Sequence, residues 1–335
     1  VYQKHPNWAT NKYTADGRLN TQLWDEERLT TWFDTFMPTL ELRNDTVADL
    51  MSDSALVWIT EYDFDGFRHD ATKHIPMNFT RLLTEKIRAA SEDHVYQIGE
   101  TYGSDELIAS YVGSGKVDAQ FNFNLYDAAF EAFTQEGATF DRLRKALESS
   151  LTYYGHHHLM GNISGNQDKP RFSSMASGHL SMSEDSKLAG WTREIPEPSE
   201  RGYRKMAAMH AFNIAVPGIP ILYYGDEIAL HGGNDPDNRK MMPFDFSPRQ
   251  QQLFDRIARL NENRTNIMAL NYGSTTVHQP EPHLLIIVRK YMEQEVLFFF
   301  NNSNEDRYLE EWDITVPADG ISQTLVFSQN VSRPK

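Results

Sequence analysis

The 335-residue chain contains no cysteine, which excludes disulfide bonds but does not separate the cytoplasm from a bacterial periplasm. It also lacks a run of about 18 apolar residues, the length that a membrane-spanning helix needs. Positive charge is scarce: 32 Lys and Arg residues face 47 Asp and Glu residues, and the formal net charge is -15. Nucleic-acid binding requires clustered Lys and Arg. We therefore expect no transmembrane segment in this chain and no nucleic-acid partner, and a neutral substrate suits the charge.

The first residues also lack the usual features of a protein's start. Val1-Tyr2-Gln3-Lys4 contains no initiator Met, no apolar signal segment and no cleavage site. We expect either that a leader has been removed or that the sequence begins inside a longer polypeptide. These residues leave the localisation unknown; we expect a periplasmic or secreted bacterial protein, with the cytoplasm as the alternative.

What the chain does have is a globular composition, 40% hydrophobic, and an alternation of short apolar runs with helical patterns from about residue 44 to 263. This alternation predicts repeated strand–helix units and a parallel sheet. Beyond about residue 270 a hairpin and two short strands predict a small all-β domain. The expected strands are 66–70, 95–100, 118–123, 158–163 and 219–224, then 283–291, 295–301, 314–316 and 324–327; the expected helices are 77–90, 200–216 and one starting at 247.

Arg68 and Asp70 lie two residues apart at the end of the first expected strand. Residues two apart on a strand share a face, so we expect the guanidinium beside the carboxylate. Such a neighbour keeps a carboxylate ionised, as a nucleophile or a charge stabiliser requires. An ordinary Arg–Asp pair explains the two residues equally well. Lys73 and His74 follow in the connecting loop, where hydrogen-bond donors for a polar substrate would lie.

Two further acids follow apolar segments. Glu100 ends the second expected strand, where a carboxyl group partly removed from water would stay protonated and serve as a general acid. Asp168 lies in the polar turn 165–171. Taken singly, these are also consistent with a surface Glu and a simple loop. Together, the three carboxylates match the rim of a (β/α)8 barrel, where catalysis occurs, and two of them about 5 Å apart would indicate a retaining glycosidase.

These segments resemble the α-amylase family of glycoside hydrolases. The segment 66–74 (GFRHDATKH) resembles the family's second signature region, 99–101 (GET) the third and 166–168 (NQD) the fourth. The segment 218–227 (GIPILYYGDE) is similar to the eighth barrel strand and its loop. The segment 37–41 (MPTLE) is similar to a motif of neopullulanases and cyclomaltodextrinases, which with maltogenic amylases are the closest in character.

The resemblance implies a (β/α)8 TIM barrel followed by a small C-terminal antiparallel β-domain. It places the tail of domain B at residues 1–45, the barrel from about its fourth strand at 46–267, and a β-sandwich at 268–335. An Asp-x-x-x-Asn-His segment, the family's first signature, is not present in these residues. We therefore expect that about the first three strands belong to a missing N-terminal segment of the same polypeptide.

The resemblance also implies roles for single residues. Asp70 would be the nucleophile, Glu100 the general acid and base, and Asp168 would stabilise the distorted sugar ring. Arg68 would keep Asp70 charged. The resemblance further implies substrate-binding roles for Lys73, His74, Gln167, Asp235 and Arg239.

Several points stay open at this stage. The Asp-rich loop 232–239 has a metal site as its rival interpretation, although the spacing of a calcium loop is absent. The chemistry requires no cofactor; structural calcium is conceivable, but its expected ligands would lie in the missing segment. The family usually has His where this chain has Gln167, which can donate to a hydroxyl but cannot become charged. His156, His157 and His158 form a triple that we interpret as a loop.

The expected function is a retaining α-glucan hydrolase that cleaves α-1,4 bonds, with α-1,6 bonds as a further class, in starch, maltooligosaccharides or cyclodextrins. A glucan transglycosylase with the same acids is one alternative. A truncated, non-catalytic glucan-binding homologue is another. Relatives that serve as heavy subunits of amino-acid transporters have lost the acids and gained a membrane helix, which does not fit this chain.

Overall fold

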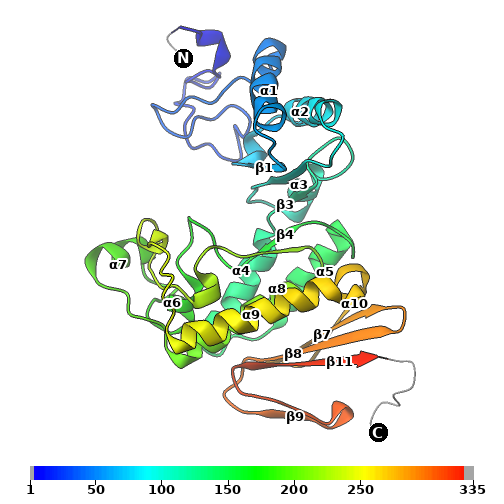
Figure 1. Ribbon diagram of the computed structural model, residues 1–335. Coiled ribbons are helices and arrows are strands. Elements are labelled where there is room, and N and C mark those ends of the chain that lie inside the picture. The colour runs from blue at the N-terminus through cyan, green and yellow to red at the C-terminus, as the bar shows by residue number, and fades with distance from the viewer. Residues whose placement is uncertain (1–3, 328–335) are drawn as a thin grey trace. The chain divides into compact units, whose positions relative to one another are not determined.

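The computed structural model describes residues 4–327, and the chain divides into two compact units, residues 1–121 and 122–335 (Figure 1). Each unit is described by itself. The division falls inside the segment 46–267 that the sequence predicts to be the barrel. The predicted boundaries at 45/46 and 267/268 stay predictions.

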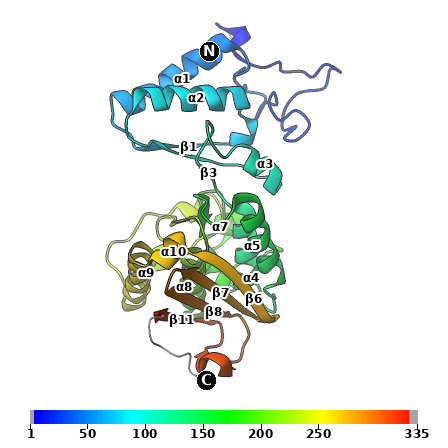
Figure 2. The same ribbon diagram turned by 90° about the vertical axis from the view of Figure 1, so that its right-hand side faces the viewer.

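Unit 1 contains a three-stranded parallel sheet in the order β1-β2-β3, with two helices packed side by side along it (Figure 2). Phe79, Leu83 and Ile87 recur at every fourth position of α2 and are buried against α1. The predicted helix 77–90 is confirmed. The elements are η1 (Pro6–Trp8), α1 (Asp45–Thr60), β1 (Gly66–His69), η2 (Thr72–His74), α2 (Met77–Ala90), β2 (Tyr96–Gly99), α3 (Asp105–Ser110) and β3 (Ala119–Gln120).

Residues 9–44 form an irregular segment held by side-chain contacts. Trp32 is only 2% exposed, and its indole Nε1 donates to the Thr10 carbonyl at 3.1 Å. Trp32 is therefore a core residue of this segment. Asn44 ends the segment and caps α1, because its side chain accepts hydrogen bonds from the amides of Thr46 and Val47.

Unit 2 begins at Asn122, whose side chain accepts from the Leu125 amide and caps α4. The cap explains why the expected strand 118–123 is only two residues long. The elements are α4 (Phe123–Thr134), α5 (Asp141–Tyr154), β4 (Gly161–Ile163), α6 (Phe172–Ala176), α7 (Ser186–Thr192), α8 (Glu200–Ala215), β5 (Ile219–Ile221), η3 (Asp226–Ile228), η4 (Asp237–Arg239), α9 (Pro248–Asn266), α10 (Met268–Tyr272), β6 (Ser274–Glu281), β7 (Leu284–Tyr291), β8 (Gln294–Asn301), β9 (Arg307–Leu309), η5 (Glu310–Trp312), β10 (Ile314–Val316) and β11 (Gly320–Phe327).

The parallel strands of the described residues fall into two sheets, β1-β2-β3 in unit 1 and β4-β5 in unit 2. Within residues 4–327 these strands form no closed barrel. Helix α9 runs alongside α8 (Figure 1), and its Ser247–Gln250 capping box is present as expected. No helix in the described part of the chain is long and apolar enough to cross a membrane.

The C-terminal part of unit 2 is an antiparallel sheet in the order β11-β8-β7-β6, which confirms the predicted hairpin. Its two faces have separate cores. Phe300 contacts Phe133 of α4 and Phe212 of α8 on the helical side. Ile286 and Phe299 belong to the core of the opposite face, which β9 and β10 help to cover.

Two arginines close the C-terminal end of α8. Arg264 of α9 donates to the carbonyls of Ile214, Val216 and Gly218 at 3.0, 3.2 and 2.5 Å. Arg289 of β7 donates to the Ala215 carbonyl at 3.0 Å and is fully buried. These cations satisfy carbonyls that a helix end leaves unpaired, and they complement the negative end of its dipole.

Candidate active site

Arg68 lies at the centre of the acidic cluster in unit 1. Its guanidinium forms an ion pair with Asp70 through Nη1 and a second one with Glu100 through Nη2, the latter at 2.9 Å. Asp70 directly follows β1 and Glu100 directly follows β2, so the two acids extend from adjacent parallel strands. The side chain of Asp70 is 76% exposed and that of Glu100 is 13% exposed. The expected contact of Arg68 with Asp70 is therefore confirmed, and its contact with Glu100 was not anticipated.

A buried threonine fixes the backbone beside these acids. Thr72 is 1% exposed; its Oγ1 donates to the His69 carbonyl and accepts from the Glu100 amide, each at 2.9 Å. Its own amide donates to the Glu100 carbonyl at 2.7 Å. Ala71, between Asp70 and Thr72, has a left-handed backbone with φ 45°. Thr72 thus joins the ends of β1 and β2 directly behind the two carboxylates.

Lys73 and His74 follow on η2, and both contact the irregular segment of unit 1. Lys73 Nζ lies 3.3 Å from a carboxylate oxygen of Asp25. His74 is 9% exposed, donates from Nδ1 to the Arg28 carbonyl at 2.7 Å, and touches the rings of Trp24 and Phe33 edge-on. Burial lowers the pKa of His74 below its usual value. The structure therefore gives His74 a packing role in addition to the substrate-binding role that stays a prediction.

Asp168 belongs to a second cluster, in the loop after β4 of unit 2. Its amide donates to the Asn166 side chain at 2.9 Å, and Gln167 Nε2 donates to Asp168 Oδ2 at 2.8 Å. Arg239 Nη2 lies 3.2 Å from Asp168 Oδ1, and Arg239 Nη1 lies 3.2 Å from Asp235 Oδ1. Arg239 therefore joins Asp168 to Asp235, as Arg68 joins the two acids of unit 1.

A buried network below this loop was missed by the sequence reasoning. Arg171 is 2% exposed; its Nη1 lies 3.0 Å from Asp226 Oδ1, and its guanidinium stacks on Tyr223. Ser164 Oγ donates to Asp226 Oδ2 at 2.5 Å. Burial raises the pKa of Asp226 to about 6 in spite of the Arg171 charge, which lowers it. Arg171 also donates to the Asn238 carbonyl at 2.8 Å, which ties the Asp168 loop to η4.

The structure thus brings the predicted residues together in two groups, one in each unit. Unit 1 holds Arg68, Asp70, Lys73, His74 and Glu100, and unit 2 holds Gln167, Asp168, Asp235 and Arg239. Signals for the missed pair were present, since Arg171 follows Asp168 by three residues and Asp226 ends the YYGD segment. Within residues 4–327 no place gathers three or more His, Asp or Glu side chains that could hold a metal ion. Calcium binding stays a prediction.

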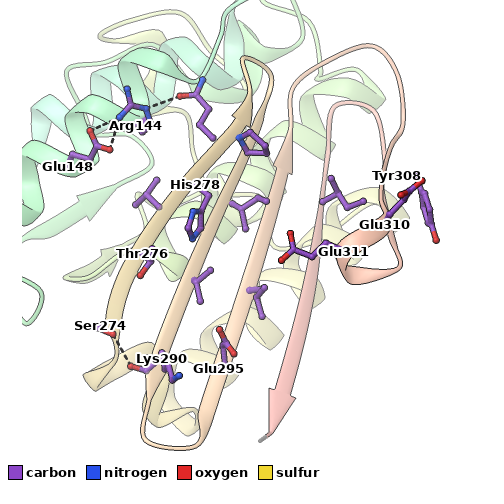
Figure 3. A pocket seen from close by; sticks show the side chains of 17 residues that line it. Arg144, Glu148, Ser274, Thr276, His278, Lys290, Glu295, Tyr308, Glu310 and Glu311 are labelled. Atoms are coloured by element: carbon purple, nitrogen blue, oxygen red, sulfur yellow. Dashed lines mark hydrogen bonds and ion pairs between the residues drawn. The ribbon is translucent and has the colours of Figure 1, made fainter. Parts of the chain in front are cut away.

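A cavity of about 890 Å³ lies on the outer face of the C-terminal sheet, where none of the predicted site residues contributes (Figure 3). His278 of β6 and Glu311 of η5 extend over the same face of the sheet. Arg144 and Glu148 of α5 form an ion pair at its edge, at 2.6 Å. Its lining of sheet residues lacks the carboxylate pairs bridged by arginine that mark the two clusters above.

Comparison with known proteins decides the family. The model of the alpha-amylase catalytic domain matches residues 2–268, which is most of the chain. The chain belongs to the alpha-amylase family. Among solved structures, an α-amylase from Anoxybacillus aligns with a TM-score of 0.76 and 23% identity, covering 97% of this chain and 69% of that one. This alpha-amylase family member therefore has the fold of the family's barrel enzymes, with the expected small antiparallel domain after it.

Each of three curated relatives aligns with most of this alpha-amylase family chain, but the alignment covers less than half of the relative. A cyclomaltodextrinase of Geobacillus thermopakistaniensis is 27% identical over 88% of this chain and 46% of its own length. An intracellular maltogenic amylase of Bacillus subtilis is 24% identical over 81% and 42%. A cyclomaltodextrin glucanotransferase of Paenibacillus macerans is 25% identical over 91% and 38%. The chain thus spans less than half the length of each of these relatives.

Proposed function

We propose that the protein is a retaining α-glucan hydrolase acting on α-1,4 bonds of maltooligosaccharides or cyclodextrins, with α-1,6 bonds as a further substrate class. In this proposal Asp70 attacks the anomeric carbon and forms a glycosyl ester. Glu100 donates a proton to the leaving oxygen and then removes one from water. Asp168 binds sugar hydroxyls and favours the flattened ring of the transition state.

The sharing of Arg68 by Asp70 and Glu100 carries this proposal. Two carboxylates that contact the two ends of one guanidinium must be near one another. Retaining glycosidases hold their carboxyl groups about 5–5.5 Å apart, whereas inverting enzymes leave about 6.5–9.5 Å for a water molecule. A shared arginine holds the two carboxylates close enough to act on one glycosidic bond, and we propose the retaining arrangement for them. Arg68 also places a positive charge in contact with Asp70.

The exposures of the two acids support the division of roles. Asp70, at 76% exposed, is open to a substrate, whereas Glu100, at 13% exposed, is largely withdrawn from water. A withdrawn carboxyl group suits a proton donor.

The test is hydrolysis of maltoheptaose and of β-cyclodextrin by the full-length protein, with the anomeric configuration of the first product followed by proton NMR. We expect α-products. Asp70→Asn should lower kcat by at least about three orders of magnitude, because the nucleophile is lost. Asp93→Asn, the same change at an exposed site of unit 1, should leave the rate unchanged. Initial β-products, or an unchanged rate for Asp70→Asn, would overturn the proposal.

Transglycosylation is a second candidate, because one relative is a cyclomaltodextrin glucanotransferase that aligns over 91% of this chain. The same acids serve both reactions, and only the acceptor differs. Product analysis at high maltoheptaose concentration separates them: longer or cyclic products indicate transfer, and shorter products alone indicate hydrolysis. Binding of maltooligosaccharides without any turnover would instead support a non-catalytic glucan-binding homologue.

A further inference from the structure

A groove between α8 and α9 is lined by four arginines and one glutamate, in a chain with a formal net charge of -15. Helix α9 contributes Arg249, Arg256 and Arg259, and α8 contributes Arg204 and Glu200. The groove has a volume of about 350 Å³. The two helices lie side by side along their length (Figure 1).

The arrangement follows from helix geometry. Arg249, Arg256 and Arg259 are spaced by seven and three residues, so they lie on one face of α9. That face meets α8 at Ala207, whose small side chain leaves space in the groove. Leu253, between the arginines on the same helix, is buried and forms its base.

Among residues 4–327, three of these arginines have no anionic partner. Arg249 lies 3.6 Å from Glu200 in an exposed pair. Arg204, Arg256 and Arg259 form no hydrogen bond or ion pair within the described residues. Elsewhere in the chain, Arg43 and Arg193 lie against carboxylates that raise their pKa.

Arg256 shows the electrostatic consequence. Desolvation, and then the like charge of Arg259, lower the pKa of the Arg256 guanidinium. Like charges three or four residues apart destabilise a helix by a few tenths of a kcal/mol. These arginines are exposed to solvent in the groove, and an anion bound between them would offset the repulsion.

We propose that this groove binds a small phosphorylated molecule, with one or two phosphate groups held by Arg204, Arg256 and Arg259. A guanidinium presents paired donors that match two phosphate oxygens, which makes arginine well suited to such a ligand. The volume lies at the lower end of ligand pockets and suits a molecule of the size of a sugar phosphate. Tyr203, also in the lining, supplies a ring against which a sugar can pack. The site is independent of the glycosidase proposal, since none of its residues belongs to either acidic cluster.

The test measures binding of pyrophosphate to the full-length protein by calorimetry, together with the shift of Tm. Pyrophosphate should raise Tm more than potassium chloride at equal ionic strength, since a ligand that binds only the folded state stabilises it. The double variant R256A/R259A should weaken binding by about tenfold or more, equivalent to about 1.4 kcal/mol. The double variant R81A/R88A removes two helix arginines from α2 and should bind like the parent.

Three outcomes would overturn the proposal. The first is equal stabilisation by chloride, which would show only general screening. The second is unchanged pyrophosphate affinity in R256A/R259A. The third is a dimeric protein that R256A/R259A converts to a monomer, which would make the groove a protein interface. R256K/R259K, which keeps the charges but loses the paired donors, should bind more weakly than the parent and more tightly than R256A/R259A.

Discussion

The two acidic clusters have the same arrangement of charges, but different parts of the structure support them. In each, one arginine joins two carboxylates: Arg68 joins Asp70 to Glu100, and Arg239 joins Asp168 to Asp235. In unit 1 the acids directly follow paired strands, and backbone hydrogen bonds through Thr72 fix their position. In unit 2 Asp168 lies on a loop. The comparison indicates that the acids at the strand ends are held by the local hydrogen bonds of Thr72. The acid on the loop instead depends on the buried Arg171–Asp226 network below the loop.

The largest loss of stability should come from breaking the buried Arg171–Asp226 pair below the Asp168 loop. Arg171→Met leaves the Asp226 carboxylate buried without its cation, and breaking such a pair costs about 3–5 kcal/mol. Urea unfolding at pH 7 should show this loss. The double variant R171M/D226N, which carries neither charge, should regain part of it. An unchanged midpoint for Arg171→Met would show that the buried pair does not support the loop.

The second-largest effect is a loss of folding stability on acidification, which should be larger in unit 2. Burial lowers the pKa of His158 and of His210 to about 4, so the folded state loses stability as pH falls from 6.5 towards 4. The raised pKa of Asp226 acts with the opposite sign, because its contribution is present at low pH and is lost as pH rises through 6. Two histidines outweigh one aspartate, for a net loss on the order of 3 kcal/mol.

Hydrogen–deuterium exchange at pH 7 and pH 4.5 measures this effect separately for peptides of each unit. Protection around α8, which carries His210, should fall first. His210→Gln should reduce the dependence on pH, because glutamine does not titrate. A loss that begins in α1 and α2 of unit 1 would contradict the assignment.

A smaller loss of stability is expected from removing the hydrogen bonds of the Thr72 hydroxyl in unit 1. Thr72→Val keeps the shape but removes the hydroxyl that joins His69 to Glu100, at a cost of about 1 kcal/mol. If the strand ends position Glu100, kcat should fall while KM changes little. Thr80→Val, a matched change at a buried threonine of α2, should leave kcat unchanged. Equal kinetics for the two variants would remove Thr72 from the positioning of the acid.

The smallest effect concerns Gln167, which donates to Asp168 at 2.8 Å. Gln167→His introduces a side chain with a usual pKa of about 6.5 that can become charged next to the substrate hydroxyls. We expect a higher specific activity and a changed pH–rate profile for hydrolysis of maltoheptaose. A profile and specific activity identical to those of the parent would mean that the neutral donor serves equally well.

Local pattern predicted part of the regular structure; the helices α1, α4 and α5 were not among the expected elements. The helix at 77–90 was predicted with its bounds because its apolar residues recur on one face, and the Ser247 cap because four adjacent residues specify it. The pairing of Arg68 with Asp70 followed from the two-residue period of a strand. In each case the information lies within a few residues of sequence.

Features that depend on distant segments were not predictable in the same way. Asp226 lies 55 residues after Arg171, and nothing local in either loop shows that the two meet. The burial of His74 depends on Trp24 and Phe33 from a segment without periodicity. The roles of the carboxylates in catalysis stay predictions, since they rest on the family and not on local pattern.

The buried Arg289 has a consequence for how this family's modules can be exchanged. The family model ends at residue 268, yet Arg289 extends from β7 to donate to the last turn of α8. A protein cut after residue 268 would lose this donor and also Phe300, which packs on Phe212 of the same helix. Such a trimmed protein would expose an apolar helix face and unpaired carbonyls, and we expect it to aggregate. The C-terminal sheet is therefore not a detachable appendage; it completes the hydrophobic interior of unit 2.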